Sequence, residues 1–190
     1  MSGRYLKRSE ILSSPLTVMD LKNYLRIDHD DEDDFIASLI LTAHQMVENF
    51  THVILSPQDF SLFYDEMPCA EIVFAKSPIL AVEGVRVYSA DTHFVSFDAA
   101  ADFTLDLSGH WARLVLGENI RAQTNLRVLN AVEIRFKAGF ADEAKIPAPM
   151  IQAIRMMVAY LYNHRGDEAL EALMLSGARA LLAPYKMRRL

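Results

Sequence analysis

The chain has 190 residues and a formal net charge of −6, and 52% of its residues are hydrophobic and 23% charged. These values are ordinary for one globular domain, with an apolar share high enough to leave some surface for subunit contacts, whereas the negative charge disfavours tight binding of nucleic acid. A single cysteine, Cys69, excludes an internal disulfide, and the sequence shows neither a signal peptide nor a run of ~20 apolar residues, so we expect a cytoplasmic protein without a membrane partner.

The first third of the chain predicts two helices. Residues 1–13 show no clear period and are expected to form a flexible arm. Thr17 lies three residues before Asp20, the spacing of an N-terminal helix cap, so a first helix is expected over roughly 18–26. A second helix is expected to begin inside the run Asp28–Asp34, because acidic side chains favour a helix N-terminus, and to end near Thr51. The helical segment is thus 14–56.

From 58 to 140 the apolar residues alternate with polar ones, and β-branched and aromatic residues are frequent. Turn residues divide this part into short pieces, which predicts a mainly antiparallel sheet or a small sandwich. The expected strands are 60–65, 71–75, 82–89, 94–98, 103–107, 113–117 and 131–140.

The last part of the chain is again helical. Pro147 and Pro149 suit the first turn of a helix with a broad apolar face, and a shorter helix is expected over about 167–182, ended by Pro184. The predicted fold class is α+β, in a single domain. It consists of a helical bundle (14–56 and 147–183) with a β-rich antiparallel insertion (58–140) and a tail (184–190).

The acidic run between the first two helices invites a calcium-binding interpretation. Asp28, Asp30 and Glu32 alternate as in an EF-hand loop, but Asp33 replaces the required glycine and Leu39 replaces the final glutamate. A helix cap with a solvated acidic face is favoured. If this acidic face has a function, we expect it to form a patch at a subunit interface. Its members are Asp30, Asp31, Glu32, Asp33 and Asp34.

A second candidate site lies on the second helix. His44, Glu48 and His52 are spaced four apart and could ligate zinc, which would make the chain a small metal-dependent enzyme using a His/Glu/Asp site. The HExxH spacing is missing and eight residues rotate His52 away from His44, so a stripe on the protein surface is favoured. No motif for a nucleophile, a phosphate loop or a cofactor is present, and no cofactor is expected.

The C-terminal sequence PYKMRRL combines aromatic, apolar and cationic residues at a chain end. Tyr, Met and Arg are enriched in interface cores. A frayed basic tail is the plainer interpretation. The composition modestly favours a binding segment.

Four stretches resemble the head–tail connector proteins of tailed bacteriophages, prophages and gene transfer agents: residues 16–51, 134–140, 146–168 and 181–190. The resemblance implies a structural protein and not an enzyme. Such proteins form a ring, typically twelve-fold, beneath the portal protein, extend the DNA channel, and carry a stopper or tail-side connector protein. Packaged DNA passes through without specific binding. The resemblance thus places the chain in a virion or phage-like particle assembled in the bacterial cytoplasm.

In this family the C-terminal segment commonly docks into the portal. The resemblance therefore assigns portal docking to a set of residues that we call the docking segment. Its members are Leu182, Pro184, Tyr185, Lys186, Met187, Arg188 and Arg189.

Overall fold

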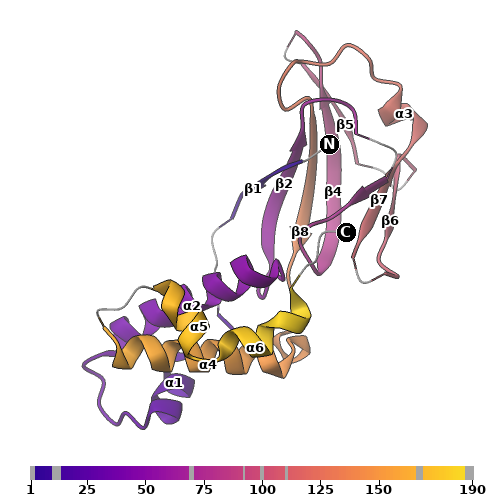
Figure 1. Ribbon diagram of the computed structural model, residues 1–190. Helices are drawn as coiled ribbons and strands as arrows, with labels where there is room; N and C mark the ends of the chain where they lie inside the picture. Colours follow the sequence, from indigo (N-terminus) through magenta and orange to yellow (C-terminus); the bar gives the residue numbers. More distant parts are fainter. Residues whose placement is uncertain are drawn as a thin grey trace. The chain divides into compact units, whose positions relative to one another are not determined.

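A computed structural model describes residues 3–9, 14–68, 71–91, 93–98, 101–109, 111–165 and 169–186. The predicted single domain corresponds to two compact units, one of Met1–Ile11 with Pro57–Gly139 and one of Leu12–Ser56 with Phe140–Leu190. The first unit is built mainly of strands and the second of helices (Figure 1). The predicted α+β class, with antiparallel sheets between the N-terminal helices and the long C-terminal helix, is confirmed.

The β-rich unit contains two antiparallel sheets, of order β1-β2-β8-β4-β5 and β3-β7-β6. Every predicted strand is present, and a short helix, α3, adds to them. The elements are β1 (Arg4–Lys7), β2 (Gln58–Tyr64), β3 (Glu71–Val73), β4 (Ile79–Tyr88), β5 (Phe94–Phe97), β6 (Phe103–Asp106), β7 (Arg113–Leu116), α3 (Glu118–Arg121) and β8 (Val132–Ala138).

Strand β1 corrects the prediction of a flexible arm at the N-terminus. Arg4–Lys7 pair with β2, from Arg4 opposite Phe63 to Lys7 opposite Phe60. The strand lies at the edge of its sheet, where Leu6 stays 55% exposed, so the apolar alternation that reveals inner strands is missing.

The two sheets of this unit meet through an aromatic cluster. The ring of Phe136, on β8, lies 5.5 Å from that of Phe60 and 4.9 Å from that of Phe74. Phe74 directly follows β3 of the smaller sheet, so this contact joins the sheets into a sandwich. The expected sheet or small sandwich is therefore present.

The helical unit is organised around α4. This helix packs against α2, α6 and the short α5. The elements are α1 (Val18–Leu25), α2 (Asp33–Thr51), η1 (Glu143–Lys145), α4 (Ala148–Asn163), α5 (Ala169–Leu175), α6 (Ala178–Leu182) and η2 (Ala183–Tyr185). The predicted helices over 18–26, up to Thr51 and from Pro147 are confirmed. The last predicted helix is split, because Gly177 has φ 80, a left-handed conformation that interrupts an α-helix.

Local chemistry explains where these helices begin. The Thr17 hydroxyl accepts a hydrogen bond from the Asp20 N–H at 3.1 Å, and the Asp20 carboxylate accepts one from the Thr17 N–H at 2.9 Å. The Thr17 hydroxyl also donates to the Asp20 carboxylate at 2.7 Å, and this hydrogen bond, followed by that from the Thr17 N–H, lowers the pKa of Asp20. Pro149 occupies the first turn of α4, where its missing N–H has no helical partner to lose. None of the described helices is long and apolar enough to cross a membrane.

Candidate interaction surface

The docking segment begins inside the helical unit. Leu182, at the end of α6, is fully buried in the helical core, and Tyr185 packs partly buried against the same core. Leu182 therefore has no exposed surface for a partner and acts as a core residue, which corrects its place in the docking segment. The sequence did not distinguish the two roles, because Leu182 belongs both to the apolar stripe of α6 and to the C-terminal sequence assigned to docking.

The exposed part of the docking segment follows directly. Pro184 and Lys186 are exposed, and the Lys186 Nζ lies 4.8 Å from the centroid of the Phe50 ring on α2. The Lys186 N–H donates to the Ala183 carbonyl at 3.3 Å, which closes the turn η2. Met187, Arg188 and Arg189 lie outside the described residues. The described chain thus ends at Lys186, which lies against α2.

The acidic run is partly neutralised by a nearly buried lysine. The Lys22 side chain is only 5% exposed, and its Nζ donates to Asp30 and, at 2.9 Å, to Asp33. These hydrogen bonds raise the pKa of Lys22, and the Lys22 hydrogen bond lowers the pKa of Asp30. Asp30 and Asp33 therefore hold the α1–α2 loop in place, and Asp33 also begins α2.

Glu32 joins the same loop to the end of α4. Its carboxylate accepts hydrogen bonds from the Tyr162 hydroxyl and, at 2.5 Å, from the Arg165 guanidinium. The Tyr162 hydrogen bond, followed by that from Arg165, lowers the pKa of Glu32. The Arg165 guanidinium also stacks over Phe35 at 4.8 Å. Glu32 is therefore engaged within its own unit.

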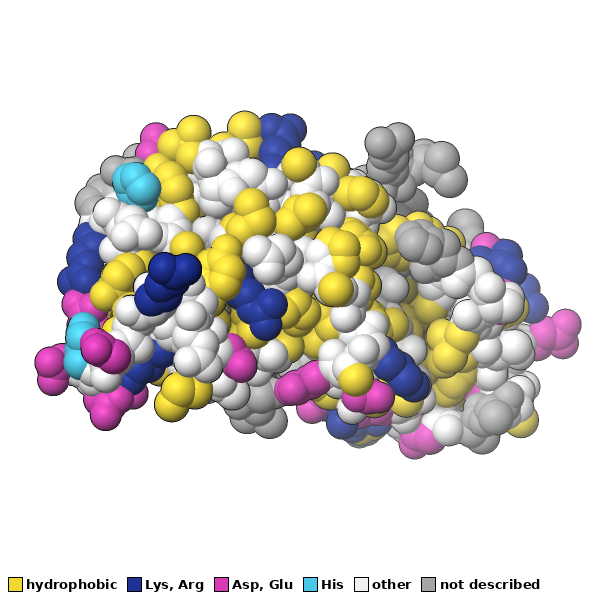
Figure 2. Space-filling view, turned by 90° about the horizontal axis from the view of Figure 1, so that it is seen from below, with side chains coloured by type: hydrophobic (Ala, Val, Ile, Leu, Met, Phe, Trp, Pro, Cys, Tyr) yellow, Lys and Arg dark blue, Asp and Glu magenta, His cyan; other side chains and the backbone are white. Residues whose placement is uncertain are grey.

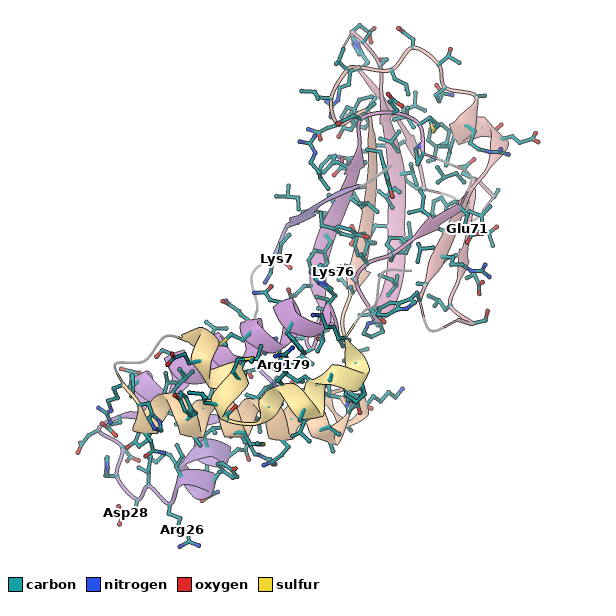
Figure 3. The ribbon with its side chains drawn as sticks, in the orientation of Figure 1. Lys7, Arg26, Asp28, Glu71, Lys76 and Arg179 are labelled. Atoms are coloured by element: carbon teal, nitrogen blue, oxygen red, sulfur yellow. The ribbon has the colours of Figure 1, made fainter. Side chains whose placement is uncertain are left out.

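Two members of the acidic run remain turned to solvent. The Asp31 side chain is 93% exposed and lies 3.8 Å from the His29 Nδ1, and Asp34 is also exposed. Neighbouring Arg26 and Asp28 point away from the helices (Figure 3). Figure 2 shows acidic side chains gathered at one end of the helical unit, next to a face with many hydrophobic side chains. A partner can reach Asp31 and Asp34 without breaking the ion pairs made by Lys22 and Arg165.

The predicted surface stripe on α2 is wrong, because His44 and Glu48 are buried. The His44 Nε2 lies 3.1 Å from the Glu48 Oε1, which also accepts a hydrogen bond from the Leu55 N–H at 2.8 Å. His52 ends α2 in a left-handed conformation, φ 62. Across the described residues, no three His, Cys, Asp or Glu side chains are grouped so as to hold a metal ion. His44 falls within the apolar stripe between Ile40 and Val47, a signal that indicates burial.

The family described as "Phage gp6-like head-tail connector protein" matches residues 15–91. Residues 15–91 are thus similar in sequence to head–tail connector proteins. The matched part covers α1, α2 and strands β2 to β4. No curated protein sequence shows significant similarity to the chain.

Solved structures extend the likeness to nearly the whole chain. A chain in the neck of an empty GTA particle computed with C6 symmetry has 22% identity and a TM-score of 0.78, with 98% of this chain and 97% of that chain covered. A chain in the virion of a native gene transfer agent (GTA) particle has 23% identity and a TM-score of 0.75, with 98% and 96% covered. A chain in the neck of a native GTA particle computed with C12 symmetry has 21% identity and a TM-score of 0.76, with 98% and 97% covered. At these identities the likeness shows a common fold, which includes the β-rich unit beyond residue 91.

Proposed function

We propose that this chain is the structural head–tail connector of a phage or gene transfer agent particle. It assembles as a ring beneath the portal, extends the DNA channel and joins the head to the tail. The connector-family match over residues 15–91 carries the proposal. The fold shared with chains of GTA necks, one of them computed with C12 symmetry, supports it and favours a twelve-fold ring.

Portal docking is assigned to the exposed part of the docking segment, which excludes Leu182. Pro184 and Lys186 are exposed at the point where the chain leaves α6, and the following residues add two cations, Arg188 and Arg189. A segment that combines cationic, aromatic and apolar residues suits a protein interface, where Tyr, Met and Arg are enriched. Tyr185 and Lys186 fix the origin of this segment on the helical unit.

Contacts between neighbouring subunits are assigned to the exposed members of the acidic patch. Asp31 and Asp34 are the available carboxylates, while Asp30, Glu32 and Asp33 shape the loop that presents them. In a head-to-tail ring, one surface of a subunit meets a different surface of the next, so acidic and basic patches can pair. The net charge of −6 suits a channel through which DNA passes without specific binding.

Deleting the gene in a particle-producing strain tests the proposal. Without a connector, DNA-filled heads should accumulate beside unattached tails, and a plasmid copy of the gene should restore complete particles. Electron cryomicroscopy of restored particles should show the chain as a ring between portal and tail. Complete particles at the normal yield in the deletion strain would refute the proposed function.

A further inference from the structure

The solvent-facing side of α2 is uncharged beyond the first turn of the helix. Its exposed residues recur every three or four positions and so share one face, which we call the α2 face: Asp34, Ala37, Ser38, Leu41, Gln45 and Asn49. Leu41, in the middle of this face, is 42% exposed. An amphipathic helix usually places charged residues on the side that meets water. The α2 face instead has an apolar centre and an acidic end.

The corner between α5 and α6 presents two apolar side chains and a cation. Met174 and Leu175, at the end of α5, are 52% and 66% exposed. Arg179, in α6, is also exposed, and its Nη1 donates to the Met174 Sδ at 3.2 Å. A thioether is a weak acceptor, so a carboxylate of a partner would be a stronger one. We call these three residues the α5–α6 corner.

Local contacts hold the backbone of this corner. The Ser176 hydroxyl donates to the Ala172 carbonyl, and it accepts a hydrogen bond from the Ala178 N–H at 3.3 Å. Gly177 has φ 80, and a Cβ at this position would lie 3.3 Å from the Met156 Cε, so the turn packs closely on α4. The exposed side chains of the corner therefore start from a fixed backbone, which lowers the entropy cost of binding.

The α2 face and the α5–α6 corner complement each other. Both have an apolar part, and the exposed carboxylates of Asp31 and Asp34 at one surface match the Arg179 cation at the other. Each surface also has one exposed charge of the opposite sign nearby, Arg26 beside the acidic loop and Glu171 on α5. Ion pairs of both directions can then fix the register of a contact.

The two surfaces lie apart within one chain. Both belong to the helical unit, so comparing them does not involve the β-rich unit. Figure 3 shows Arg179 well separated from Asp28, which stands in the acidic loop. The match therefore suits two copies of the chain. A contact between two different surfaces of identical copies is the head-to-tail contact that closes a ring.

We infer that the α2 face of one copy packs against the α5–α6 corner of the next copy in the ring. Met174 and Leu175 cover Leu41, and Arg179 pairs with the carboxylates of Asp34 and Asp31. The inference rests on the proposed function, which sets copies of this chain side by side beneath the portal. It names the surface that meets the acidic end of α2.

Exchanging charges tests this contact in the deletion strain supplied with variant genes. Arg179→Glu and Asp34→Lys each place like charges at the contact, so each should lower the number of connector chains per DNA-filled head roughly tenfold. The double variant restores opposite charges. Coexpression of the two single variants should do the same, because alternating copies in an even-numbered ring place opposite charges at every contact. Arg121→Glu, at an exposed arginine of α3, is the matched control.

Mass spectrometry of purified heads counts connector chains against portal chains. All purified variants should keep the wild-type Tm; if Asp34→Lys does not fold, Asp31→Lys replaces it, because Asp31 is exposed and precedes α2. Loss in both single variants, with recovery in the double variant and on coexpression, supports the inference.

The other outcomes overturn it. A normal number of Arg179→Glu chains would show that the corner lies outside the contact, and failure of both combinations would show that the two charges do not meet. Recovery in the double variant alone would mean that they pair within one chain. Absence of the wild-type chain from all heads would instead refute the proposed function.

Discussion

The Nζ atom of Lys186 lies 4.8 Å from the centroid of the Phe50 ring, so the last described residue of the chain is held on α2. The turn of Ala183–Tyr185 brings it there, and Tyr185 packs against the helical core just before it. The origin of the docking segment is therefore fixed before any partner binds.

Replacing Lys186 with Gln should loosen this attachment. A cation–π contact at an exposed site contributes about 0.5–1 kcal/mol, so amide hydrogen exchange in the turn of Ala183–Tyr185 should become about two- to fivefold faster. Lys186→Arg keeps a cation above the ring and should exchange at the wild-type rate. Equal acceleration in both variants would show that the charge is irrelevant.

The buried pair of His44 and Glu48 on α2 predicts that two substitutions of Glu48 lower the free energy of unfolding by different amounts. Glu48→Leu leaves His44 and the Leu55 N–H without their acceptor and should lower the free energy of unfolding by about 2–3 kcal/mol. Glu48→Gln retains an acceptor oxygen and should lower the free energy of unfolding by about 1 kcal/mol. Urea denaturation measures both values. Equal losses would mean that packing, and not hydrogen bonding, sets the role of Glu48.

The left-handed conformation of Arg26 predicts that glycine at this position is more stabilising than alanine. It ends α1 with φ 60, a conformation that costs residues with a Cβ roughly 1–2 kcal/mol, and its side chain points away from the helices (Figure 3). Arg26→Gly should be about 0.5–1 kcal/mol more stable than Arg26→Ala, after allowance for the more flexible unfolded chain of the glycine variant. The alanine variant controls for the lost charge. An alanine variant as stable as the glycine variant would contradict strain at this position.

Asp106 gives the β-rich unit a defined response to acid. Hydrogen bonds from the Ser108 hydroxyl and N–H, followed by that from Arg113, lower the pKa of Asp106 from 3.8 to about 2. Since the folded pKa is lower, the stabilisation is complete above pH 3.8 and is lost as the pH falls toward 2. An NMR titration of this carboxyl group should give a midpoint near 2, raised by Ser108→Ala. A midpoint near 3.8 would mean that these hydrogen bonds do not persist in solution.

Much of the fold could be predicted because the periodic patterns are strong. The apolar stripe of α2, the cap at Thr17 and the alternation in β8 each agree with the structure. Strand β1 could not be predicted, because an edge strand with one side exposed needs no apolar alternation. The division of the last helix depends on a single backbone conformation, at Gly177, that composition does not reveal.

The candidate surfaces were harder to predict, since they depend on which polar groups find partners. Sequence spacing grouped five acidic residues, but only the fold shows that Lys22 and Arg165 engage three of them. The same limit applies to Val128 and Leu129. Their chemistry is that of core residues, yet the fold leaves them 86% and 61% exposed.

Removing residues 187–190 and measuring binding to purified portal rings tests whether the C-terminal segment docks into the portal. This truncation spares Tyr185 and Lys186, which pack on the helical unit, so the Tm should stay within about 2 °C of the wild type. Portal binding should be lost while the fold remains. Undiminished binding by the folded, truncated chain would contradict it.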